Sequence, residues 1–324
     1  MDVGDGSMTE RDSLDPSPSD SPKPPGISRY LAVVGLTLYA IMVWYIGWQK
    51  VRDELANANL GLILFAAFLT ITATWIRALK WRYALGPGHS AVGLFFMSKA
   101  TGNWSPGRLG EFAPMALRRH RTPKIGAWIM LDRVLEIAVT LGLGLMGLYL
   151  INILEPEMYV LVFILAISGG AGGIYLLTRR DIFLAIADRV KTDGILHRFA
   201  MLFAAISDEL VLFVKTLPGI LAITILTKCM DLWAVLLIFV GFGYRPGFAL
   251  IAAAKCALAI VSFLPLTPSA TGVPHVTQAW LMHYTADIPY EGLAVGIGVE
   301  VVIISVTFWT SVGLAATHVR GALK

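Results

Sequence analysis

The stretch NWSPGRLGEFAP, residues 103–114, interrupts a chain that is otherwise strongly apolar. It combines a Ser-Pro step and two glycines with the charged side chains of Arg108 and Glu111. In a soluble protein such a stretch would be a surface loop, because glycine and proline favour turns and charged side chains favour water. The apolar runs on both sides indicate instead that it lies within a membrane protein.

Composition supports this interpretation. The 324 residues are 56% hydrophobic and 15% charged, with a mean hydropathy of +0.69. Soluble domains carry about 25% charged residues. Several apolar runs approach the roughly 20 residues that cross a bilayer as a helix, and the alternating pattern of a membrane β-barrel is absent. We therefore expect an all-α polytopic membrane protein.

The apolar runs predict about six transmembrane helices, at residues 30–48, 60–80, 124–152, 158–178, 217–242 and 291–316. Residues 1–28 are rich in Pro, Ser and Asp, which predicts a disordered cytoplasmic tail and not a signal peptide. Residues 29–324 are expected to form a single transmembrane domain.

Basic residues set the expected orientation. Lys and Arg concentrate after the second and the fourth predicted helix, which places both termini on the cytoplasmic side of the cytoplasmic (inner) membrane. The segment 181–215 is expected to lie at the cytoplasmic surface as one or two amphipathic helices. The net charge of +4 belongs to these connectors and does not indicate a nucleic-acid partner.

Two further apolar stretches, 91–118 and 248–285, are polar in the middle, and each half is only about 10–14 residues long, as in re-entrant helices. Each contains Ser or Thr, then Pro, then Gly four residues later. The order helix, helix, broken segment, helix describes residues 30–152 and again residues 158–316, with opposite starting sides. This predicts an inverted repeat, a recurrent design of transporters.

Other residues fall at matching places in the two repeats. Lys99 and Lys255 both lie just upstream of a break, and Arg77 and Lys80 of the second helix correspond to Lys228 and Asp231 of the fifth. The sequence WIRALKWRYAL, residues 75–85, suits an interfacial anchor, in which Trp75, Trp81, Arg77 and Arg82 lie in the headgroup zone.

The two breaks have the composition of an anion site. A Ser or Thr before Pro is a helix-start signal, and the N-terminus of a half-helix offers free N–H groups that favour an anion. Arg108 would add a guanidinium that forks onto a lipid phosphate. The alternative is that both breaks are structural kinks. The candidate headgroup-binding residues are Asn103, Ser105, Pro106, Gly107, Arg108, Gly110, Glu111, Thr267, Pro268, Thr271, Gly272 and His275.

Ionisable residues inside the predicted spans are costly and are functional candidates by default. They are Lys99, Asp132, Arg133, Glu136, Lys228, Asp231, Lys255 and Glu300. Helical spacing predicts the pairs Arg133–Glu136 and Lys228–Asp231, which could serve only to fix helix packing. Glu111 and Glu300 have no such local partner and could hold a cationic headgroup or a coupling proton.

Two stretches resemble a known family. SKATGNWSPGRLGEFAPMALRRH, residues 98–120, and LDRVLE, residues 131–136, are similar to the flippase-like membrane domain of bacterial lysylphosphatidylglycerol synthases. The resemblance covers about residues 30–320. The matching positions are Asn103, Pro106, Gly107, Arg108, Gly110, Glu111, Asp132, Arg133 and Glu136. At the second break the family pattern has a Glu three residues after its last Gly, where this chain has His275.

The resemblance implies translocation of a phospholipid, or of a lipid with a modified headgroup, between leaflets. Its partners would be membrane phospholipids and a separate lipid-modifying enzyme. We expect no catalytic residues, no metal and no cofactor, since Cys229 and Cys256 lack a metal-type spacing. No room remains for the aminoacyl-transfer domain, so a synthase is not expected. The alternatives are a membrane-embedded transferase, with Glu111, Asp132 or Glu300 as acid or base, and an accessory subunit or passive scaffold.

Overall fold

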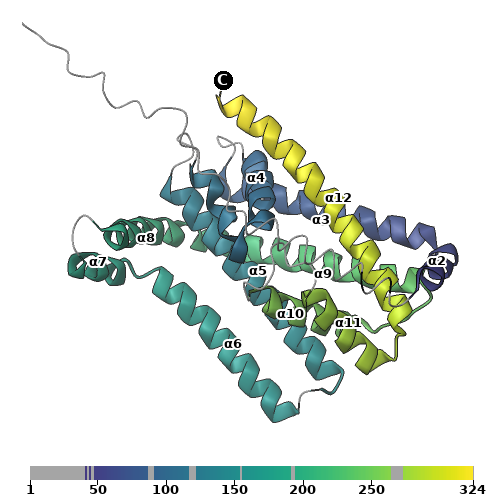
Figure 1. Cartoon of the computed structure of the whole chain (residues 1–324). Helices are drawn as coiled ribbons and strands as arrows, with labels where there is room; N and C mark the ends of the chain where they lie inside the picture. The colour runs from purple at the N-terminus through teal and green to yellow at the C-terminus, as the bar shows by residue number, and fades with distance from the viewer. Residues whose placement is uncertain are drawn as a thin grey trace, which may run out of the picture.

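The structure is a computed structural model, shown in Figure 1. It describes residues 41, 44, 47–86, 91–116, 122–153, 155–190, 194–263 and 273–323. All regular secondary structure within these residues is helical. The predicted tail 1–28, most of the predicted helix 30–48 and the second break at 264–272 lie outside the described residues.

The described helices follow the chain in this order: α2 Trp48–Ala56, α3 Leu60–Leu85, α4 Ala91–Trp104, the 3₁₀ helix η1 Pro106–Ala116, α5 Pro123–Leu150, α6 Pro156–Leu177, α7 Arg180–Arg189, α8 Ile195–Leu212, the 3₁₀ helix η3 Val214–Thr216, α9 Leu217–Gly241, α10 Phe248–Phe263, α11 Val273–Ala286 and α12 Tyr290–Leu323.

Three of these helices are long and apolar enough to cross a membrane: Leu60–Leu85, Leu217–Gly241 and Tyr290–Thr317. They coincide with the predicted spans 60–80, 217–242 and 291–316. The predicted spans 124–152 and 158–178 are present as the helices α5 and α6. The helical class is therefore confirmed, whereas the number of six spans stays a prediction.

Helices α3 and α9 pack closely and run antiparallel through the middle of the molecule (Figure 1). At one end the backbone N–H of Asn59, which caps α3, donates to the carbonyl of Gly241 at 2.7 Å. At the other end a Cβ on Gly219 would lie 3.3 Å from the hydroxyl of Tyr83. Ala66 and Ala234 are buried in the cluster between them. Small side chains thus let two spanning helices approach closely.

Small residues also bring α5 and α10 together. A Cβ on Gly144 would overlap the Cβ of Cys256, and a Cβ on Gly147 would lie 2.9 Å from the backbone nitrogen of Ala253. Helices in lipid gain their association largely from such close packing. Helix α12 packs in turn against α4. Three pairs, α3–α9, α5–α10 and α4–α12, therefore form the frame.

The predicted interfacial anchor at residues 75–85 is wrong in part. Trp75 is 44% exposed, as expected, but Trp81 is 1% exposed and Arg77 is buried. The ring of Trp81 packs against Trp128 of α5 at 6.2 Å and against Phe95 of α4 at 5.8 Å between ring centroids. One face of α3 is exposed while the other packs against α4, α5 and α9, and the two faces cannot be distinguished by composition alone.

The predicted amphipathic segment 181–215 contains α7 and α8, which pack against each other through the rings of Phe183 and Phe203, 5.4 Å apart. Their exposed apolar side chains include Ile182, Ile186, Leu196 and Phe199. Helix α8 also packs on α5, and both helices lie at the left of Figure 1. Their position at a membrane surface stays a prediction.

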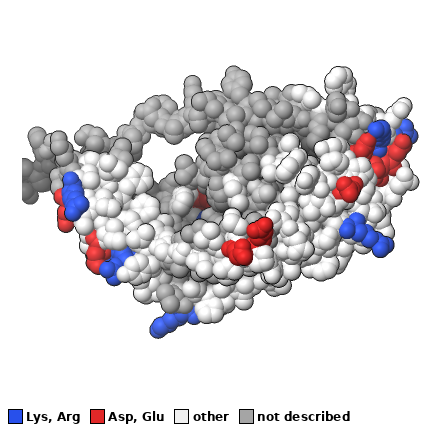
Figure 2. Space-filling model, turned by 90° about the horizontal axis from the view of Figure 1, so that it is seen from below, with Lys and Arg blue, Asp and Glu red and all other residues white. Residues whose placement is uncertain are grey.

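In the face shown in Figure 2, most Lys, Arg, Asp and Glu side chains lie toward the left and right ends of the molecule. The broad surface between these ends carries few charged side chains apart from a small acidic patch. This distribution is typical of a protein whose middle lies in lipid and whose ends reach water.

The α5–α10 contact makes a stability prediction with an internal control. Gly144→Ala should lower the apparent melting temperature of the detergent-purified protein, because the added methyl group overpacks the contact with Cys256 at a cost of about 1–3 kcal/mol. Gly142→Ala, on the same helix, meets nothing within 4 Å and should leave the melting temperature equal or slightly higher. Equal effects of the two substitutions would contradict the packing.

Candidate functional site: a buried charge network

The break predicted at residues 103–114 is present as a helical hairpin. Helix α4 ends at Trp104, the chain bends at Ser105, and η1 packs back against α4. The hydroxyl of Ser98 on α4 donates to the carbonyl of Glu111 at 2.9 Å. At the bend, the N–H of Gly110 donates to the hydroxyl oxygen of Ser105 at 2.6 Å. Side-chain hydroxyls therefore hold the two arms together.

The sequence predicts that a half-helix starts at the Ser-Pro step, and the helix that starts there, η1, is a 3₁₀ helix. Pro114 has no N–H and so cannot donate to the carbonyl of Gly110, as an α-helix would require. The hydroxyl of Thr101 donates to that carbonyl instead, at 2.5 Å. Ser105 consequently binds the N–H of Gly110, not the second or third N–H of an α-helix.

The hairpin aims Glu111 at helix α5. Its carboxylate is 4% exposed and forms an ion pair with the guanidinium of Arg133, which is 24% exposed. Arg133 also bonds Glu136 on its own helix at 2.5 Å, which confirms the predicted local pair. A Cβ on Gly102 of α4 would lie about 3.0 Å from the Glu111 carboxylate. Gly102 therefore leaves the space that this carboxylate occupies.

Helices α3 and α9 add a second layer to this site. Arg77 pairs with Asp231, donates to the carbonyl of Thr227 at 3.3 Å, and lies 3.9 Å from the carboxylate of Glu136. Asp231 thus has a partner on another helix, and the pair Lys228–Asp231 that helical spacing predicts stays a prediction. Lys228 lies near enough to Glu136 to attract its carboxylate.

A third pair is sealed from the surface. Lys80 pairs with Asp132, and the two side chains are 0% and 2% exposed. Lys80 also donates to the hydroxyl of Thr224 at 3.1 Å, and the indole N–H of Trp81 donates to Asp132 at 3.0 Å. No headgroup can reach these charges without unpacking the core, so this pair holds α3, α5 and α9 together.

We refer to Arg77, Lys80, Glu111, Asp132, Arg133, Glu136, Lys228 and Asp231 as the central charge cluster. Among its described side chains, four are cationic and four are acidic, so the cluster is formally neutral. Asp231 lies near the middle of the 25-residue α9, and Glu136 near the middle of the 28-residue α5. Balanced charge at this depth offsets the desolvation that an isolated ion would suffer.

A smaller group lies near the second break. Lys255 of α10 pairs with Glu300 of α12, and Gln278 of α11 bonds both at 3.3 Å. Glu300, which has no local partner in the sequence, thus obtains one from another helix, as Glu111 does. His275 lies near the start of α11, within electrostatic reach of Glu300 and Lys255.

The remaining predicted residues fall into two groups. Lys99 lies half-buried on α4, and the backbone of Asn103, Pro106, Gly107 and Arg108 follows α4 and η1. Thr267, Pro268, Thr271 and Gly272 lie outside the described residues. Within the part of the chain that the structure describes, no group of three or more His, Cys, Asp or Glu is placed to hold a metal ion.

The sequence pattern does not indicate several members of these networks. It places Arg77 in an interfacial anchor and Lys80 at a position that matches the other repeat. It predicts no role for Gln278, Thr224 and Thr227. The spacing of Arg77, Lys80 and Trp81 indicates that these side chains of α3 share one helical face and meet the same neighbouring helices. Gln278 gave no such signal, since its partners Lys255 and Glu300 are both distant in sequence.

Comparison with known families gives a match over most of the chain. The family model described as the lysylphosphatidylglycerol synthase TM region matches residues 32–314. The chain belongs to this family. The resemblance carried by residues 98–120 and 131–136 is thereby confirmed. No curated protein and no solved structure gives a significant match. Membership in the lysylphosphatidylglycerol synthase TM-region family, together with the apolar helices, makes the chain a multi-pass membrane protein related to lipid modification or flipping.

The sealed pair predicts strong coupling between two residues. Asp132→Asn should destabilise the protein by about 3–5 kcal/mol, because it leaves the Lys80 ammonium buried without its counter-charge. The double variant Lys80→Met with Asp132→Asn should be more stable than Asp132→Asn alone, because it also removes the unpaired buried ammonium of Lys80. The Asn oxygen can accept from Trp81 in both variants. Thermal unfolding of Lys80→Met, Asp132→Asn and the double variant in detergent measures this. Additive effects would contradict the ion pair.

Proposed function

We propose that the chain translocates a phospholipid, or a lipid with a modified headgroup, between the leaflets of the cytoplasmic membrane. The observation that carries the proposal is the Glu111–Arg133 ion pair at the hairpin that opens the first break. Ionisable groups at this depth are costly, and transporters place them along substrate pathways. A protein that only anchored a partner would gain nothing from them.

The accessible part of the cluster is suited to exchanging partners. Arg133 is bonded by two carboxylates and remains 24% exposed, and the Asp231 carboxylate that faces Arg77 is 33% exposed. A lipid phosphate can take the place of Glu111 on the guanidinium of Arg133, because phosphate and carboxylate use the same bidentate geometry. The released Glu111 carboxylate can then accept a hydrogen bond from an ammonium group of the headgroup. With a headgroup that carries one phosphate and one amine, as in phosphatidylethanolamine, the total charge of the site is the same before and after the exchange.

The exposed fractions of Arg133 and Asp231 support access to the cluster from the surface. A headgroup could move along this path while its acyl chains stay in lipid. We propose that Arg108 and the second break add to this path, and that a separate lipid-modifying enzyme supplies the lipid.

We also propose the inverted repeat of residues 30–152 and 158–316. Its second helices would be α3 and α9, which are antiparallel. In such a repeat α4 corresponds to α10, and α5 to α12, so the contact α5–α10 has its counterpart in α4–α12, and both are extensive. The hairpin of α4 and η1 likewise corresponds to the packed pair α10 and α11. This pairwise match supports a two-fold arrangement around the α3–α9 contact, with the two re-entrant segments on opposite sides.

Translocation can be measured in vesicles that contain acyl-labelled phosphatidylglycerol, phosphatidylethanolamine or lysylphosphatidylglycerol. Glu111→Gln and Arg133→Gln should each lower the initial rate about tenfold or more, because a hydrogen bond to a charged group contributes about 1.5–3 kcal/mol. Glu157→Gln, on the exposed first turn of α6, is the control and should leave the rate unchanged.

The double variant Glu111→Gln with Arg133→Gln separates folding from function. It removes both charges, so it should unfold at a higher temperature than Arg133→Gln alone and yet remain inactive. Wild-type rates in both single variants would refute the headgroup path. If mass spectrometry detects chemical conversion of the headgroup in the same vesicles, the membrane-embedded transferase is favoured instead.

The proposed orientation can be tested by thiol labelling in intact cells, with Cys229 and Cys256 replaced by Ala. Arg52→Cys on α2 should react with an impermeant maleimide, since this helix lies in a connector expected outside. Arg189→Cys on α7 should react only after permeabilisation. The opposite pattern would place the termini outside and overturn the orientation.

A further inference from the structure

Helix α2 lies across one end of the frame, at the right of Figure 1. It is nine residues long, Trp48–Ala56, and lies close to the start of α12 and to the connector between α9 and α10. Among the side chains of this helix that the structure describes, Val51 is buried and apolar, and it joins the cluster of Ala66, Ile238 and Val295.

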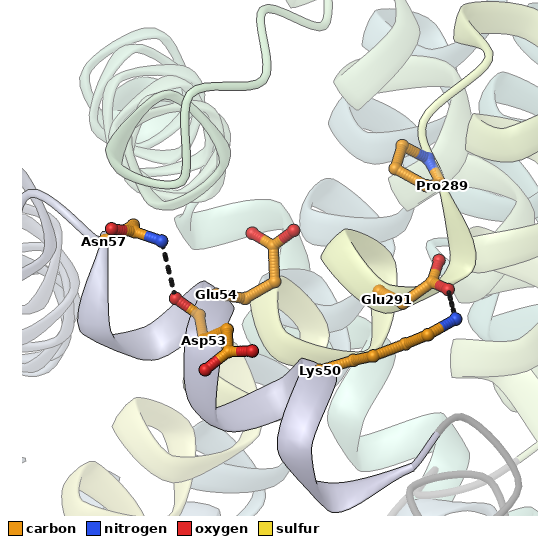
Figure 3. Close-up of a pocket in the computed structure, with 6 residues that line it drawn as sticks. All are labelled: Lys50, Asp53, Glu54, Asn57, Pro289 and Glu291. Atoms are coloured by element: carbon orange, nitrogen blue, oxygen red, sulfur yellow. Dashed lines mark hydrogen bonds and ion pairs between the residues drawn. The ribbon is translucent and has the colours of Figure 1, made fainter.

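Two polar contacts also attach α2 to its neighbours. The ammonium of Lys50 pairs with Glu291 of α12 at 2.7 Å (Figure 3). The hydroxyl of Tyr244 donates to the Glu54 carboxylate at 2.9 Å. Burial, together with the bond to Glu54, raises the pKa of Tyr244 to about 12, so this hydroxyl stays a donor at any physiological pH. Both contacts join α2 to residues of the second proposed repeat.

Near these two polar contacts, α2 does not pack tightly against the start of α12. An open pocket of about 400 Å³ separates α2 from the α11–α12 connector (Figure 3). It is lined by Lys50, Asp53, Glu54, Asn57, Pro289 and Glu291. The Lys50 side chain is 64% exposed. The bonds can therefore be exchanged for water without exposing a packed core, and an exposed ion pair holds only weakly.

The two ends of α2 differ in a way that suits a hinged motion. Gly47 precedes the helix with φ of +95°, and a Cβ there would meet nothing within 4 Å. After the helix, Asn59 is fixed by its hydrogen bond to the carbonyl of Gly241. The glycine gives the first end of α2 conformational freedom, while the other end is tied to α9.

We propose that α2 is a latch that closes this end of the molecule through Lys50–Glu291 and Glu54–Tyr244, and that it must release each time a lipid headgroup passes. The latch rests on the proposed translocation. Its contacts join the two proposed repeats, so this end cannot open between the repeats while they hold. Movement of such a lid gates the turnover of many proteins without any part in the chemistry.

The test cross-links the latch reversibly. Lys50→Cys and Glu291→Cys are combined in a chain with Cys229→Ala and Cys256→Ala, and bridged by a bis-methanethiosulfonate reagent of matching length. The cross-linked protein should move labelled phosphatidylglycerol at least about tenfold more slowly, and reductant should restore the rate. Trp280→Cys with Tyr284→Cys, two exposed positions on α11, takes the same bridge as control and should keep its rate.

A second readout does not depend on transport. Spin labels at positions 50 and 291, in nanodiscs of phosphatidylcholine with and without phosphatidylglycerol, should give a second, longer distance population. An unchanged rate in fully cross-linked protein would overturn the latch and leave translocation intact. If the protein without a cross-link moves no lipid, the proposed translocation is wrong, and the spin-label distances alone test whether α2 moves. Two distance populations would support the motion of α2, and a single short distance would overturn it.

Discussion

The ion pair between Glu111 and Arg133 connects the local sequence to the fold and to the proposed chemistry. A carboxylate on a broken helix can enter an apolar core only if a cation meets it there, because an isolated buried charge is far too costly. Three features of the hairpin position that carboxylate: the bend at Ser105, the space left by Gly102, and the carbonyl of Gly110 satisfied by Thr101. Arg133 then ties the hairpin to α5.

Around this pair, the buried charges divide by their access to the surface. Lys80 and Asp132 are sealed, and their loss should affect stability first. Arg133 and Asp231 retain exposed surface, and their loss should affect lipid movement first. A single neutral network can thus serve both purposes. The sealed pair keeps three helices in register, while the accessible residues offer charges of both signs to a headgroup that carries a phosphate and an amine.

Local patterns in the sequence predicted the parts of this architecture that depend on neighbours along the chain. Apolar runs located α3, α9 and α12, and the spacing of Arg133 and Glu136 predicted their contact. The partners of Glu111, Asp231 and Glu300 could not be predicted, because each lies on another helix and depends on how the helices pack. Trp81 shows the same limit, since composition suited it to the interface while packing buried it against α5. Pro114 also signals an interruption after the bend, because it has no N–H to donate to a carbonyl of the preceding turn.

The central claim is that a lipid phosphate replaces Glu111 on Arg133. Electron cryomicroscopy of the protein in nanodiscs that contain phosphatidylglycerol tests it most directly, with an antibody fragment added for size. The account predicts density for a phosphate within hydrogen-bond distance of the Arg133 guanidinium, with the Glu111 carboxylate turned away from it. An intact Glu111–Arg133 pair, with lipid phosphates found only at the level of the bilayer headgroups, would contradict it.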